Sequence, residues 1–192
     1  IMIVTPYYSK PSQHGILRHF EEISKITDLP IMAYNIPGRT STLIELETLQ
    51  TLVDDIGIHS IKDAVGDFEF SKKQLELLKD KAAIYSGNDN QTFDFIINGG
   101  IGVVSVASHV VGDEISAMIS FAKNKDFAKA EKINNQLSNL FEAIFEEPSP
   151  GPIKKILSES WEEVGEPLLP ITTISDELAH KIRGFYKKIK EN

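Results

Sequence analysis

The residue best suited to chemistry is Lys62, which ends the apolar segment 58–62. Its neighbours Ile61 and Val65 are apolar, so we expect the amine to be partly removed from water. Desolvation disfavours the ammonium form, lowers the pKa and leaves a neutral fraction that can attack a carbonyl carbon. A lysine that forms a Schiff base needs this property. The alternative is an exposed loop lysine that forms a surface pair with Asp63.

A tyrosine ends another apolar segment, residues 30–34, and an arginine follows it. Strand alternation places Tyr34 on the same side as Met32, where a phenol could pass protons to a nearby imine. Arg39, held by a Pro-Gly turn, carries a planar guanidinium that suits a carboxylate. The alternatives are a core tyrosine with a satisfied hydroxyl and an ordinary surface arginine.

Two adjacent tyrosines and several glycines are weaker candidates. Tyr7 and Tyr8 point to opposite sides, so at most one faces the same site, and packing at an interface is the alternative for Tyr7. Gly87 would allow a close approach of the backbone to a ligand, although turn geometry explains it equally well. The five histidines are scattered and the chain has no cysteine, so we expect no metal site and no cysteine nucleophile.

Five short apolar segments must position these residues, and each is interpreted as a strand. They are residues 1–5, 30–34, 58–62, 82–86 and 101–107. Amphipathic helical patterns fill the gaps, which predicts βα repeats and a parallel sheet. None of the five alternates strictly between apolar and polar residues, which favours strands covered on both faces.

After residue 122 the strand patterns stop and helical patterns continue. We therefore predict an α/β fold with two parts: a partial (β/α) barrel of five βα units over residues 1–122 and a C-terminal helical region over residues 123–192. A complete (β/α)₈ barrel needs about 250 residues and eight strands. We thus expect a TIM barrel that lacks its first three βα units. An open doubly wound sheet is the alternative, but no Gly-rich phosphate fingerprint follows any strand.

Composition excludes several classes of protein. The 192 residues are 41% hydrophobic, enough for a sizeable core. Twenty basic and 28 acidic residues give a net charge of −8, which disfavours a nucleic-acid partner. No apolar run approaches the roughly 20 residues that cross a bilayer, and residues 1–6 lack the features of a signal peptide. The sequence predicts a soluble, cytoplasmic protein with no membrane partner.

Five ordered motifs resemble the dihydrodipicolinate synthase family, the pyruvate-dependent class I aldolases that include N-acetylneuraminate lyase. They are VTPYY at 4–8, YNIPGRT at 34–40, IKDA at 61–64, SGND at 86–89 and GGIGVVSV at 99–106. The resemblance implies a TIM-barrel lyase with catalytic residues Lys62, Tyr34 and Tyr8. Lys62 would form an imine with pyruvate, and Tyr34 would relay protons. Tyr8 would complete the relay in a neighbouring subunit, with Tyr7 at the same dimer interface.

The resemblance also implies the substrates. Arg39 would bind the carboxylate of the aldehyde, while Gly87 and Val104 would line the pyruvate pocket through their backbones. Arg39 favours condensation of pyruvate with aspartate 4-semialdehyde to 4-hydroxy-tetrahydrodipicolinate, in lysine biosynthesis through diaminopimelate. The alternatives are a sialic-acid or sugar-acid aldolase and a non-catalytic fragment. We expect a homotetramer, a dimer of dimers, with no dissociable cofactor because the lysine adduct itself serves as the electron sink.

Overall fold

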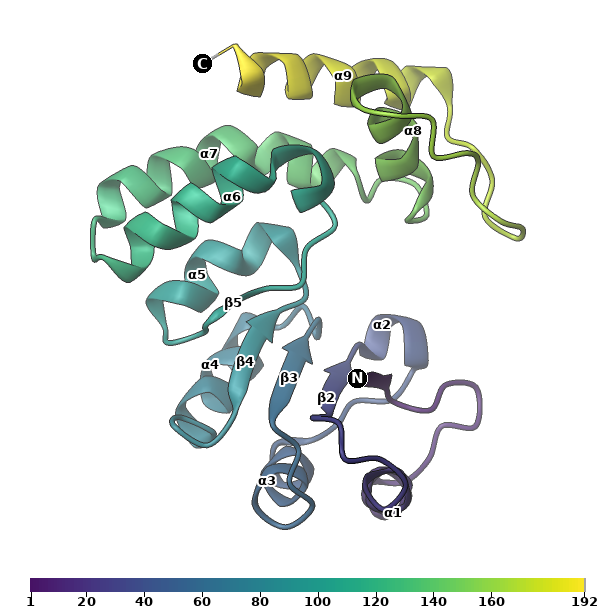
Figure 1. Cartoon of the computed structure of the whole chain (residues 1–192), viewed down its shortest axis with the longest axis vertical. Helices are drawn as coiled ribbons and strands as arrows, with labels where there is room; N and C mark the ends of the chain where they lie inside the picture. The colour runs from purple at the N-terminus through teal and green to yellow at the C-terminus, as the bar shows by residue number, and fades with distance from the viewer. Residues whose placement is uncertain (192) are drawn as a thin grey trace. The chain divides into compact units, whose positions relative to one another are not determined.

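The structure is a computed structural model that describes residues 1–191 (Figure 1). These residues form two compact units, Ile1–Val104 and residues 105 onward. The first unit contains strands β1 (Met2–Val4), β2 (Met32–Asn35), β3 (Ser60–Asp63), β4 (Ala83–Ser86) and β5 (Gly102–Val103). Its helices are α1 (Gln13–Ser24), α2 (Pro37–Thr40), α3 (Leu46–Asp54), α4 (Phe68–Leu77), the 3₁₀ turn η1 (Asp89–Gln91) and α5 (Thr92–Ile97).

The five strands form one parallel sheet in chain order, β1-β2-β3-β4-β5. The five expected βα units are therefore confirmed. The last strand is shorter than the expected segment 101–107, because only Gly102 and Val103 pair with β4. Beyond them the hydroxyl of Ser105 accepts a hydrogen bond from the Ser108 backbone N–H at 2.8 Å, and the chain turns into the next helix.

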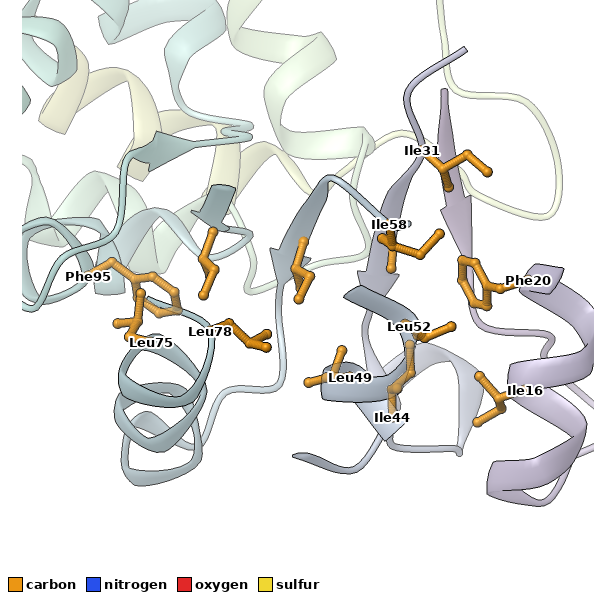
Figure 2. Close-up of a cluster of buried hydrophobic side chains, with 13 residues drawn as sticks. Ile16, Phe20, Ile31, Ile44, Leu49, Leu52, Ile58, Leu75, Leu78 and Phe95 are labelled. Atoms are coloured by element: carbon orange, nitrogen blue, oxygen red, sulfur yellow. The ribbon is translucent and has the colours of Figure 1, made fainter. Parts of the chain in front are cut away.

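Burial alternates along β2, β3 and β4, with one face of the sheet buried and the other half-exposed. The expectation that both faces are covered is wrong for the chain as described. The buried face contributes Ala33, Ile61 and Ile84 to the core shown in Figure 2. Helices supply most of the other members of this core, Ile16, Phe20, Leu49, Leu52, Leu75 and Phe95, and Leu78 lies just after the end of α4.

Side-chain caps set where two of these helices begin. The Ser12 hydroxyl accepts from the Gly15 N–H at the start of α1. The Asp67 carboxylate accepts from the N–H groups of Glu69 and Phe70 at the start of α4. Such caps satisfy backbone donors that have no partner within the helix. Because Asp67 caps α4, this helix begins after only a short loop that follows β3.

The second unit is helical in the part described. It contains α6 (Ser108–Lys123), α7 (Phe127–Ala143), α8 (Gly151–Ser160) and α9 (Asp176–Lys190). Helix α6 packs on α7 and α8, and α9 packs on α7 and α8. The expected division after residue 122 follows the last βα repeat, whereas the division after Val104 follows packing and groups α6 with the later helices. Among residues 1–191, no helix is both long and apolar enough to span a bilayer.

Candidate active site

Lys62 lies on β3 and points to the half-exposed face of the sheet. Its register partners are Tyr34 on β2 and Tyr85 on β4, so the three side chains share one face. The Lys62 Nζ lies 4.1 Å from the centroid of the Tyr34 ring. At this distance the ring attracts an ammonium and also shields one side of the amine from water. The structure thus brings together the two residues at the centre of the expected site.

The electrostatics of this pair favour the neutral forms of both groups. Burial lowers the pKa of Lys62, Arg39 lowers it further, and the negative charge of Asp89 opposes both effects. Burial raises the pKa of the Tyr34 phenol, against the effect of Arg39. Lys62 therefore reaches its neutral, nucleophilic form at a lower pH than a solvated lysine does. Tyr34 keeps its proton to a higher pH, so the phenol can donate it.

Asp63 is not the surface partner that the alternative interpretation of Lys62 required. It lies on the opposite, buried face and is 1% exposed. Its carboxylate accepts hydrogen bonds from the backbone N–H of Val65 and from the side chains of Ser71 and Gln74. Lys62 therefore faces Tyr34, whereas Asp63, the next residue along the chain, lies on the opposite face of the sheet.

The motif that follows β2 builds a rigid support for Arg39. The buried amide of Asn35 donates to the Ile44 carbonyl and accepts from the Ile44 N–H, both at 3.0 Å. The Thr40 hydroxyl lies 3.0 Å from the carbonyl oxygen of Ile36 and from that of Thr42. These bonds close the segment around α2, which carries Arg39 exposed at its surface. Among residues 1–191 no carboxylate forms an ion pair with this arginine, so it can receive an anion.

Gly87 lies directly against Lys62. Its N–H donates to the Asp63 carbonyl at 2.5 Å. A Cβ atom at this position would stand 2.7 Å from the Ala64 Cβ and 3.1 Å from the Lys62 Cε. The Ala64 Cβ and the Asp63 carbonyl oxygen, 2.9 Å from such a Cβ, leave no room for a side chain here, and the lysine stem packs closely beside the glycine. Val104 directly follows β5, and its N–H donates to the carbonyl of Ser86 at the end of β4, at 2.9 Å.

The structure does not bring Tyr8 to Lys62. Tyr8 is 94% exposed, with a φ of 64°, and Tyr7 is 68% exposed. Both side chains project from the loop that follows β1. The role of Tyr8 in a neighbouring subunit therefore stays a prediction, and its exposure leaves the phenol accessible to another chain.

Two residues of the site were missed by the sequence analysis. Tyr85 shares the face and register of Lys62, and its ring would meet a Cβ placed on Gly102 at 3.2 Å. Alternation along residues 82–86 could have identified it. Asp89 is 2% exposed and is the negative charge that acts on Lys62. Sequence offered no such signal for Asp89, because a folded turn sets that proximity. Among residues 1–191, no three His, Asp or Glu side chains are grouped to hold a metal ion.

The lowered pKa of Lys62 predicts how its reactivity depends on pH. Between this lowered pKa and the usual lysine value, Lys62 is largely neutral while a free lysine is protonated. We expect acylation of Lys62 by a dilute reagent to reach half its maximal rate at a lower pH than acylation of the ε-amine of Nα-acetyl-lysine. Peptide mass spectrometry across a pH series measures both rates, and equal midpoints would contradict the prediction.

Comparison with known proteins places this arrangement in a family. The model of the dihydrodipicolinate synthetase family matches residues 1–189. A 4-hydroxy-tetrahydrodipicolinate synthase of Thermosynechococcus vestitus is 42% identical over 95% of this chain and 62% of its own length. A dihydrodipicolinate synthase structure from Bacillus anthracis is 38% identical, with a TM-score of 0.92, over 97% of this chain and 64% of its own.

A third relative is a chloride-inhibited dihydrodipicolinate synthase from Acinetobacter baumannii, solved in complex with pyruvate. It is 32% identical, with a TM-score of 0.94, over 98% of this chain and 65% of its own. The present chain thus spans less than two thirds of the length of these relatives. The shared fold confirms that its five βα units are part of a TIM barrel. The chain belongs to the dihydrodipicolinate synthetase family.

Proposed function

We propose that this chain carries the Schiff-base site of a lyase that condenses pyruvate with aspartate 4-semialdehyde to 4-hydroxy-tetrahydrodipicolinate. The observation that carries the proposal is the half-buried Lys62 amine beside the Tyr34 ring, at 4.1 Å, in a chain of this family. The reaction would serve lysine biosynthesis. Arg39 favours it over a sugar-acid aldolase, because its guanidinium suits the carboxylate of aspartate 4-semialdehyde.

The chemistry begins at the neutral Lys62 amine. It attacks the keto carbon of pyruvate, and loss of water gives an imine between that carbon and Nζ. Removal of a proton from the pyruvate methyl group then gives an enamine, whose carbon attacks the aldehyde. The Tyr34 ring centroid lies 4.1 Å from Nζ and its phenol keeps its proton to a high pH, so Tyr34 supports the proton transfers of these steps. Gly87 and Val104 would line the pyruvate pocket through backbone groups.

Trapping with borohydride tests this function. Borohydride reduces an imine to a stable secondary amine, so incubation with pyruvate should add one reduced three-carbon unit to the peptide that contains Lys62. The 192-residue chain is the right sample, because the test also decides between a competent site and a non-catalytic fragment. A folded chain that gains no adduct at Lys62 would reject the proposal for this chain.

Replacing Arg39 by Ala tests the aldehyde substrate. A guanidinium can bind a carboxylate through two parallel hydrogen bonds, and each charge-assisted bond contributes about 1.5–3 kcal/mol. We expect kcat/KM for aspartate 4-semialdehyde to fall by about 100-fold or more, with pyruvate trapping at Lys62 retained. Lys72→Ala serves as the control for loss of one positive charge, since Lys72 lies exposed on α4. An equal loss in both variants would contradict the assignment.

The exposure of Tyr7 and Tyr8 supports the assembly of several copies of this chain. We propose a homo-oligomer, as a dimer of dimers, in which the exposed Tyr7 and Tyr8 loop meets a second copy. Large exposed aromatic side chains are common at such contacts.

The negative net charge and the absence of a membrane-spanning helix among residues 1–191 support a cytoplasmic location.

A further inference from the structure

The buried carboxyl group of Asp63 has no part in the chemistry proposed for Lys62, although it follows Lys62 directly and ends β3. It is nevertheless fully engaged. The Val65 N–H donates to Oδ1 at 2.9 Å, while the Ser71 hydroxyl and the Gln74 Nε2 donate to Oδ2 at 2.8 and 3.2 Å. One donor lies in the loop after β3 and the other two lie on α4.

The backbone of Asp63 makes a second set of connections. Its carbonyl accepts from the Gly87 N–H at 2.5 Å, which ties the end of β3 to the end of β4. Gly87 in turn packs against the Lys62 stem, since a Cβ atom there would lie 3.1 Å from the Lys62 Cε. Asp63 therefore joins α4, the following loop and the glycine that borders the lysine.

A carboxyl group in this position is costly to bury. Burial raises the pKa of Asp63, against the effect of its three hydrogen-bond donors. An apolar side chain would pack here without that cost, but apolar contacts have no direction. Hydrogen bonds do have direction. Three of them fix the course of the backbone immediately after Lys62, and with it the angle at which the lysine leaves the strand.

We propose that Asp63 is a positioning residue that holds the Lys62 amine against the Tyr34 ring by tying the end of β3 to α4. The inference rests on the proposed function, in which this amine forms the Schiff base. A displacement of about 1 Å in a reacting group can cost about 100-fold in rate, so a carboxylate on the opposite face of the sheet can control the reaction.

The test compares Asp63→Ala with a matched control, Asp67→Ala. Asp67 caps α4 and accepts backbone hydrogen bonds from Glu69 and Phe70. Its carboxylate acts on Asp63 through its charge, but the hydrogen bonds of its side chain go to α4 and not to β3. Both variants lose a carboxylate and destabilise α4. NMR of protein labelled at lysine measures the position of the amine without any reaction, because protons over an aromatic face resonate upfield. The Lys62 ε-methylene signal is assigned by its loss in Lys62→Met.

We expect Asp63→Ala to lose most of the upfield displacement of this signal, and Asp67→Ala to keep it. Among folded molecules, the rate of trapping with pyruvate and borohydride should fall at least about tenfold in Asp63→Ala only. A folded Asp63→Ala with the signal in its original place would overturn the proposal. So would an equal displacement in the two variants, because that is the result of a merely structural role.

A milder variant keeps the inference testable if Asp63→Ala does not fold. Ser71→Ala removes one of the three donors and leaves the carboxylate in place. It should move the Lys62 signal in the same direction by a smaller amount, and an unchanged signal would then refute the proposal. If the unsubstituted chain forms no adduct with pyruvate, the proposed function fails, while the NMR comparison still decides whether Asp63 positions the amine.

Discussion

Lys62→Met abolishes the adduct that pyruvate and borohydride form with this chain, and any turnover falls to background. Methionine keeps an unbranched, largely apolar stem that fits beside Tyr34 and Gly87, but it has no amine to form the imine. The expected loss in kcat is on the order of 10⁴-fold or more, because the covalent step itself is removed. Intact mass after borohydride treatment measures the adduct, and a coupled assay measures turnover.

Lys72→Met is the matched control for this prediction. The Lys72 Nζ also lies over an aromatic ring, 5.1 Å from the centroid of Phe68, but on the exposed surface of α4. Its loss should leave the adduct unchanged. An adduct of full yield in Lys62→Met would show that another amine forms the imine, and the assignment of Lys62 would then be wrong.

Gly87→Ala is expected to damage both stability and the site. The new Cβ atom would stand 2.7 Å from the Ala64 Cβ and 2.9 Å from the Asp63 carbonyl oxygen, distances that force a backbone shift. Overpacking of this kind typically costs about 1–3 kcal/mol in the free energy of unfolding. Because the shift also presses on the Lys62 stem, the rate of pyruvate trapping should fall in molecules that remain folded. Urea titration and timed borohydride quenching measure the two effects.

Gly184→Ala controls for the general effect of a glycine substitution. Gly184 lies on α9, and a Cβ atom there meets nothing within 4 Å. Alanine should leave the free energy of unfolding unchanged or raise it by up to about 1 kcal/mol, since alanine favours helix more than glycine does. Unchanged trapping and stability in Gly87→Ala as well would contradict the close packing around Lys62.

Much of the fold could be predicted from local patterns. The strands near residues 30–34 and 58–62 begin and end close to where the apolar runs place them. Alternation in a strand has a strict period of two, so it also placed Tyr34 and Met32 on one face. The length of the last strand could not be predicted in this way, because pairing with β4 rather than composition ends it at Val103.

The candidate site also has features that follow from local sequence patterns and features that depend on contacts between distant residues. Residue type and strand position already pointed to Lys62 as an amine that could become neutral, because burial disfavours the ammonium form, but the exposed alternative stayed open until the fold was known. Local patterns also placed Tyr34 at the end of one strand, Arg39 just after it, and the glycine motifs beside the fourth and fifth strands. These features depend on neighbours within a few positions along the chain.

Which of these residues meet depends on contacts between distant parts of the chain. Register between β2, β3 and β4 set Tyr34 and Tyr85 on either side of Lys62, and a folded turn brought the charge of Asp89 to bear on the amine. Register and turn packing depend on groups that are tens of residues apart, and no local pattern records their distances. Alternation along β3 places Asp63 on the face opposite to Lys62, but only packing against α4 shows that this carboxylate is buried and hydrogen-bonded rather than a surface partner of the lysine.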